Sequence, residues 1–133
     1  MDQIPDNFYR LSIKALIFDD NNKFMMIKED NGFWDFPGGA LDFGESIKDC
    51  LRREISEEMG LTVTSIADNP SCFFTSLKKN GIWIANVFYK TTVVDLAFTP
   101  SNECVDIRFF TVDEALKESM FPSFAEFVKV YQP

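Results

Sequence analysis

The chain has 133 residues, of which 46% are hydrophobic and 15 are phenylalanine, and its formal net charge is −8. A length in this range favours a single domain, residues 1–133, with a core rich in phenylalanine. The negative charge argues against a nucleic acid polymer or an anionic membrane as partner, because like charges repel. An acidic protein that handles phosphates needs a cation as mediator.

The sequence contains no histidine. This excludes Ser-His-Asp and Cys-His catalysis and every imidazole metal site. Cys50, Cys72 and Cys104 are far apart and form no CxxC motif, which favours free thiols in a reducing compartment. The N-terminus has no signal-peptide pattern, and no stretch reaches the roughly 18 apolar residues of a membrane span. We therefore expect a cytoplasmic protein.

The first part of the chain predicts a hairpin, a loop and a helix. Residues 11–18 and 23–28 are β-rich runs on either side of the turn sequence DDNN. The aromatic and glycine-rich stretch NGFWDFPGGALDFGE reads as a loop with short strand pieces. The helix that follows has Ser46 and Asp49 in the spacing of a capping box, and Gly60 suits its C-terminal cap.

The second part of the chain alternates strand and helix signals. It predicts a strand at 61–66, a hairpin of 72–77 and 82–94 around KKNG, a strand at 104–110, and a short helix at 113–118. A last helix opens at Ser123, with Glu126 completing a second capping box. Strands interleaved with about three helices predict an α/β (α+β) domain in which helices cover a mixed sheet.

Three glutamates lie in the second half of the helix that ends at Gly60. On a helical wheel with ~100° per residue and Glu54 at zero, Glu58 lies near ~40° and Glu57 near ~300°. Apolar residues share this side: Ile47, Cys50, Leu51 and Ile55. Carboxylates that turn inward repel each other and lose hydration unless they bind protons or a divalent cation. Oxygen ligands suit Mg²⁺ and Mn²⁺, so the pattern predicts a metal site without histidine.

Purely structural interpretations of these glutamates and of the glycine pair before them also remain open at this point. The glutamates are also compatible with an ordinary surface helix, since Arg53 and Glu57 have the i,i+4 spacing of a helical ion pair. Gly38 and Gly39 let the backbone approach a metal or phosphate closely, or form a plain tight turn. Glu45, at the start of the helix, suits the helix dipole and needs no catalytic role.

The segment that starts at Gly39 reads GALDFGESIKDCLRREISEEMGL. It resembles the Nudix box, GX5EX7REUXEEXGU with U apolar, and the preceding FPGG resembles the usual lead-in. The fixed positions are filled by Gly39, Glu45, Arg53, Glu54, Glu57, Glu58 and Gly60, with Ile55 and Leu61 as the apolar ones. The order of elements resembles the α/β/α sandwich of that family over most of the chain.

The resemblance implies hydrolysis of a nucleoside diphosphate linked to another group X, with cleavage inside the pyrophosphate and Mg²⁺ or Mn²⁺ as cofactor. Carried over by position, the metal ligands are Glu54, Glu57 and Glu58, with a carbonyl of Gly38 or Gly39. Arg53 would orient a glutamate through a charge-assisted bond. Glu45 and Gly60 are expected to be structural. Many members dimerise, so a homodimer is compatible with the resemblance.

The catalytic base and the group X are less well defined. The base is either Glu57 or a carboxylate outside the box, for which Glu103, before the strand CVDIRFF, is the candidate; a solvated loop acid is the alternative reading. Family markers for NADH, coenzyme A, ADP-ribose and diadenosine polyphosphate substrates are absent. Trp34 and Phe36 are candidates to stack on a base.

A non-catalytic Nudix module that senses a nucleotide is the competing function. Degenerate boxes characterise many such modules, and this box is intact, which favours a hydrolase. An isomerase of isoprenoid diphosphates shares the fold but usually needs a histidine-bearing metal site, and the chain has no histidine.

Overall fold

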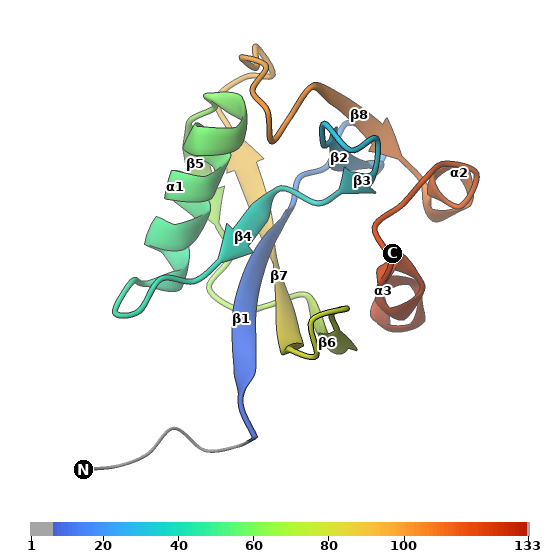
Figure 1. Ribbon diagram of the computed structural model, residues 1–133. Helices are drawn as coiled ribbons and strands as arrows, with labels where there is room; N and C mark the ends of the chain where they lie inside the picture. The colour runs from blue at the N-terminus through green and yellow to red at the C-terminus, as the bar shows by residue number, and fades with distance from the viewer. Residues whose placement is uncertain (1–6, 133) are drawn as a thin grey trace.

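The computed structural model describes residues 7–132. In this part of the chain, strands and helices interleave as the sequence predicts (Figure 1). In chain order they are β1 (Tyr9–Leu16), β2 (Phe24–Lys28), β3 (Trp34–Asp35), β4 (Gly38–Ala40), α1 (Ile47–Met59), β5 (Val63–Ile66), β6 (Cys72–Leu77), β7 (Trp83–Val93), β8 (Asp106–Phe110), α2 (Val112–Ala115) and α3 (Phe124–Val130).

The larger sheet is mixed, as predicted. Its strand order is β4-β1-β7-β5, and β6 also pairs with β7. β1 runs parallel to β7, whereas β4, β5 and β6 run antiparallel to their neighbours. A smaller antiparallel sheet has the order β3-β2-β8. In Figure 1, α1 lies on one side of β1 and β7 and α3 on the other, which gives the expected layers of helix, sheet and helix.

The first predicted hairpin is wrong, and the second is confirmed. β1 and β2 belong to different sheets and meet only near the turn, where Phe18 bridges to Phe24. The reason is that β1 is the inner strand between β4 and β7, so both of its edges are already occupied. β6 and β7 do form a hairpin, with Cys72 opposite Phe88 and Leu77 opposite Trp83.

The β1–β7 layer separates two hydrophobic cores because side chains alternate along a strand. Ile13 and Ala15 of β1 face an aliphatic core that includes Leu51, Ile55 and Met59 of α1. Leu16 faces an aromatic core, in which rings of several elements pack edge to face or stacked: Phe24, Phe36, Phe74, Phe88, Phe124 and Phe127. The predicted Phe-rich core is therefore confined to one side of the larger sheet.

The helix ends follow the sequence signals in part. Ser46 caps α1 by accepting from the backbone N–H of Asp49, and Gly60 ends it with a φ of 67°. The capping box predicted at Ser123 is wrong, since no side-chain cap bond forms there. A complete capping box stands instead at Thr111 and Glu114, before α2. None of the helices in residues 7–132 combines the length and apolar character needed to cross a bilayer.

Candidate active site

Two consecutive glycines bring β4 against both β1 and α1. Gly38 has a φ of 122°, and a Cβ there would collide with the backbone carbonyl of Ile13. A Cβ on Gly39 would lie 2.7 Å from Cδ of Glu54. The N–H of Gly38 donates to Oε1 of Glu58 at 2.9 Å. The glycine pair therefore places the backbone directly beside two of the three box glutamates.

Arg53 is the centre of an ion-pair network on α1. Its Nε and Nη2 donate to the two oxygens of Glu45 at 2.8 and 2.9 Å. Its Nη1 donates to Glu54 at 3.0 Å and to Glu57 at 3.4 Å. Because Arg53 donates to it, the pKa of Glu45 falls to about 2. Both oxygens of Glu45 are thus bound to Arg53, and Arg53 in turn holds the carboxylate of Glu54.

The three box glutamates differ in burial. Glu58 is 6% exposed, and the Glu54 side chain is 15% exposed, so both turn inward as the wheel predicts. The Glu57 side chain is 55% exposed and does not line the cavity that Glu54 and Glu58 share. Burial raises the pKa of Glu58 to about 8, with Lys14 acting in the opposite direction, and burial also raises the pKa of Glu54.

Glu54 and Glu58 face a cavity of about 410 Å³ that is strongly acidic. Glu103, from the loop before β8, lines the same cavity, so the structure brings this candidate base together with two of the expected ligands. Glu29 and Asp30, just after β2, also line it, and sequence reasoning missed them. Their signal, an acidic pair after a strand, cannot be distinguished from an ordinary turn.

The residues around this cavity fit a hard divalent cation by the chemistry of their donors. Within residues 7–132, no group of three Asp, Glu or Cys side chains is arranged so that it could hold a metal ion. The carboxylates instead bind protein donors, Glu54 on Arg53 and Glu58 on Gly38. Five carboxylates and no Lys or Arg line the cavity, which is the oxygen-rich, anionic set that Mg²⁺ and Mn²⁺ prefer. Burial raises the pKa of Glu54 and of Glu58, although Arg53 and Lys14 act in the opposite direction.

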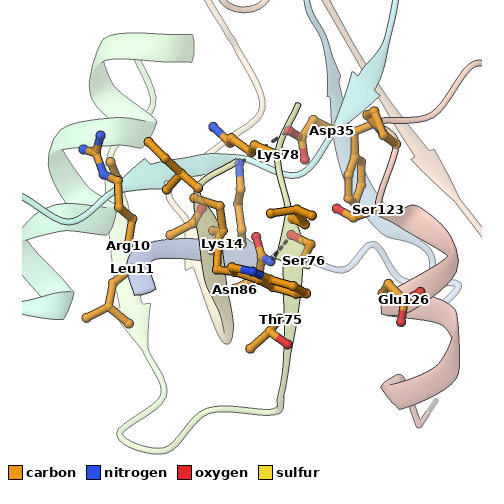
Figure 2. A pocket seen from close by; sticks show the side chains of 18 of the residues that line it. Arg10, Leu11, Lys14, Asp35, Thr75, Ser76, Lys78, Asn86, Ser123 and Glu126 are labelled. Carbon is orange, nitrogen blue, oxygen red and sulfur yellow. Dashed lines mark hydrogen bonds and ion pairs between the residues drawn. The ribbon is translucent and has the colours of Figure 1, made fainter. Parts of the chain in front are cut away.

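A larger cleft of about 1180 Å³ adjoins the acidic cavity, and Glu29, Gly39 and Ala40 line both. Lys14 of β1, also missed by sequence reasoning, lines the cleft (Figure 2). Its ammonium donates to the carbonyls of Phe36 at 3.3 Å and Gly38 at 3.4 Å. It also pairs with Asp35 at 3.6 Å. Lys14 therefore connects the cleft to the acidic cavity, because it lines the cleft and bonds the carbonyl of Gly38, which lines the cavity.

The expectation that Trp34 and Phe36 stack on a base is wrong. Trp34 is 2% exposed and Phe36 is 0% exposed, and both belong to the aromatic core. Trp34 packs edge to face on Phe110 with ring centroids 5.2 Å apart, and Phe36 packs on Phe88 at 4.9 Å. Neither ring has a face free for a ligand.

Three features together define a Nudix domain. They are a glycine pair against β1, a helix whose glutamates are bound by an arginine, and a mixed sheet between helices. The NUDIX domain family model matches residues 8–131, and the chain belongs to this family.

Among curated proteins, the chain is similar to an RNA pyrophosphohydrolase of Ruthia magnifica, with 37% identity over 67 residues. This match covers 48% of this chain and 36% of that protein. The chain spans between about a third and a half of the length of the curated relatives it matches.

Among solved structures, a MutT protein from Methanosarcina mazei has a TM-score of 0.70 and 23% identity, covering 95% of this chain and 94% of that one. This likeness concerns the fold. An ADP-ribose pyrophosphatase from Streptococcus suis has a TM-score of 0.67 and 28% identity, covering 86% of this chain and 81% of that one.

Proposed function

We propose that the chain is a divalent-metal-dependent hydrolase that cleaves the pyrophosphate linkage of a nucleoside diphosphate joined to a further group X. The observation that carries the proposal is the shared cavity of Glu54, Glu58 and Glu103 beside the backbone of Gly38 and Gly39. Relatives whose names contain pyrophosphohydrolase, diphosphatase or pyrophosphatase support the same class of reaction.

The box residues would hold the metal and keep its ligands oriented. Glu54 and Glu58 would supply carboxylate oxygens from α1, and Glu57, one turn away on the same helix, would add one, as would a carbonyl of Gly38 or Gly39. Mg²⁺ or Mn²⁺, once bound, screens the substrate phosphates and polarises the phosphoryl oxygens. Arg53 fixes the direction of Glu54 through the 3.0 Å bond, since a charge-assisted bond from a planar guanidinium restrains a carboxylate strongly.

A carboxylate at the rim takes the proton of the attacking water. Water adds to one phosphorus of the diphosphate, the base accepts one proton, and the anhydride bond breaks with its oxygen leaving on the other phosphate. Glu103 is the geometric candidate for the base because it lines the same cavity as Glu54 and Glu58 but comes from a loop outside the box. Glu57 is the candidate within the box.

The test is a panel of nucleoside diphosphate derivatives incubated with Mg²⁺ or Mn²⁺, with phosphate, pyrophosphate and nucleoside monophosphate measured separately. We expect turnover of at least one anhydride that requires metal and disappears in Glu58→Gln. Glu118→Gln, which alters an exposed carboxylate near α2, is the matched control and should retain activity. Tight nucleotide binding without any product over hours in both metals would instead identify a sensor module.

A further inference from the structure

The acidic cavity and the adjoining cleft differ in charge. The cavity is lined by five carboxylates and by no Lys or Arg. The cleft is lined by four basic residues, Arg10, Lys14, Lys78 and Lys79, and by three acidic ones, Glu29, Asp35 and Glu126. In Figure 2, Arg10 and Lys78 lie on the side of the cleft away from Glu126 of α3.

Three of the cations that line the cleft have no carboxylate partner in the described part of the chain. Across residues 7–132, Arg10, Lys78 and Lys79 take part in no ion pair, whereas Lys14 is paired with Asp35. The chain has 21 acidic and 13 basic residues, so free carboxylates are plentiful. Unpaired cations that gather in a concave surface raise the local concentration of anions.

β1 sets the distance between Arg10 and the acidic cavity. Arg10 and Lys14 lie on the same face of β1, since they are an even number of residues apart. Four residues of strand separate them by about 13 Å. Lys14 lies opposite Gly38 in the β1–β4 register, so it marks the level of the candidate metal site. Adjacent phosphates of one polyphosphate are much closer together than this.

Between Arg10 and Lys14, the floor of the cleft carries polar but uncharged side chains. Ser12 of β1 lies opposite Asn86 of β7, and both line the cleft. The Asn86 amide nitrogen donates to the carbonyl of Phe74 at 3.4 Å and to Oγ of Ser76 at 3.0 Å. Both donors of this amide are therefore held by the protein, which leaves its oxygen to accept from a hydroxyl or N–H group.

We propose that the substrate carries a second phosphate, attached to its ribose, which binds Arg10, Lys78 and Lys79. The sugar lies over Ser12 and Asn86, and the diphosphate to be cleaved lies at the acidic cavity. The inference rests on the proposed function for the place of the diphosphate. It names the substrate class as a nucleotide phosphorylated on the 2′ or 3′ hydroxyl as well as at the 5′ position.

The experiment compares nucleotides that differ only in the ribose phosphate. Calorimetry in Mg²⁺ measures the affinity of nucleoside 5′-monophosphates and of the matching 2′,5′- and 3′,5′-bisphosphates, for adenosine, guanosine, cytidine and uridine. None of these probes contains an anhydride bond, so binding is measured without turnover. We expect one bisphosphate series to bind about tenfold to hundredfold more tightly than its monophosphate, as charge-assisted contacts of this kind provide.

Arg10→Gln and the double variant Lys78→Gln, Lys79→Gln are expected to reduce this preference several-fold each. Lys117→Gln is the matched control, because Lys117 is exposed, takes part in no ion pair within residues 7–132 and lines neither cavity. Equal affinity for mono- and bisphosphates, a preference unchanged by the cleft variants, or equal loss in the control overturns the inference. No measurable binding of any bisphosphate at millimolar concentration also counts against it.

The two proposals fail separately. A preference for bisphosphates without hydrolysis of any anhydride in the metal-dependent panel contradicts the proposed hydrolase and leaves the second phosphate site in place. Metal-dependent hydrolysis without the preference contradicts only the second phosphate site.

Discussion

Gly39 lies against the carboxylate of Glu54, so close that a Cβ at this position would be 2.7 Å from Cδ and 2.8 Å from each carboxylate oxygen of Glu54. The contact joins β4 to α1 at the candidate metal site.

Gly39→Ala should therefore impair activity more than stability. The new methyl group displaces the Glu54 carboxylate from its bond with Arg53, and a shift of this kind at a catalytic centre costs about 10²-fold in rate. The measurements are kcat on the best substrate of the panel and the free energy of unfolding in urea. Ser56→Ala, at an exposed position of α1 outside both cavities, is the control and should leave kcat unchanged. Full activity in Gly39→Ala would show that Glu54 does not need its present position.

Arg53→Lys should reduce activity although the charge is kept. An ammonium cannot reproduce the fork that holds Glu45 through two bonds and Glu54 through a third. Loss of a residue that orients a metal ligand costs about 10- to 100-fold in metal affinity or activity. Titration of activity with Mg²⁺ tests this. Arg52→Lys is the control, since Arg52 is exposed and pairs only with Asp49, at 3.6 Å. A variant at Arg53 with an unchanged metal requirement contradicts the orienting role.

Glu103→Gln and Glu57→Gln distinguish the base from a metal ligand. A general base contributes about 10²- to 10⁴-fold, and its loss lowers kcat without changing the metal concentration at half-maximal activity. Loss of a ligand raises that concentration. We expect the first pattern for Glu103→Gln and the second for Glu57→Gln, both measured by steady-state kinetics over a range of Mg²⁺ concentrations. The reverse assignment follows if the patterns are exchanged.

Stability of the metal-free protein should fall as the pH rises from about 4.5 to about 8. The pKa of Glu58 is about 8 in the folded chain because of burial, against 4.5 for an ordinary glutamate. Between these values the folded state binds more protons than the unfolded state, so a higher pH favours unfolding, by roughly a few kcal/mol in total. Urea unfolding in EDTA at several pH values measures the slope.

Glu58→Gln is the control for this slope, because an amide fills the same space without titrating. Its stability should depend less on pH over the same window. Added Mg²⁺ should stabilise the wild type most at the alkaline end, where Glu58 is ionised, since a ligand that binds only the folded state raises its stability. A wild-type slope of the opposite sign would contradict the assignment to Glu58.

The sequence was sufficient for the helix and its inward glutamates because local signals determine them. Ser46 and Gly60 set the ends of α1, and the helical period places Glu54 and Glu58 on the apolar side. Glu57 shows the limit of the wheel, which cannot tell a residue at the edge of the buried stripe from one inside it.

The errors arise where distant segments compete for the same partner. β2 does not pair with β1 as a hairpin, because β7, which is distant in the sequence, pairs with β1 over its whole length. Trp34 and Phe36 stand in a sequence typical of a loop, which suggests that their rings are exposed to a ligand. In the fold, side chains of α3 and β8 pack on them, and no local sequence pattern predicts these contacts. Lys14 and Glu29 were missed for the same reason, since only the β1–β4 and β2–β8 pairings bring them to the site.

The β1–β7 layer with its two cores has a consequence for how such a protein can change over evolution. The glutamates of α1 depend on the aliphatic core, whereas the cleft floor and α3 depend on the aromatic core on the opposite side. Substitutions in the aromatic core can alter which substrate the cleft binds, while the candidate metal-binding glutamates keep their positions because they pack on the aliphatic core. Selection on substrate choice and selection on bond cleavage can thus act on largely separate sets of positions.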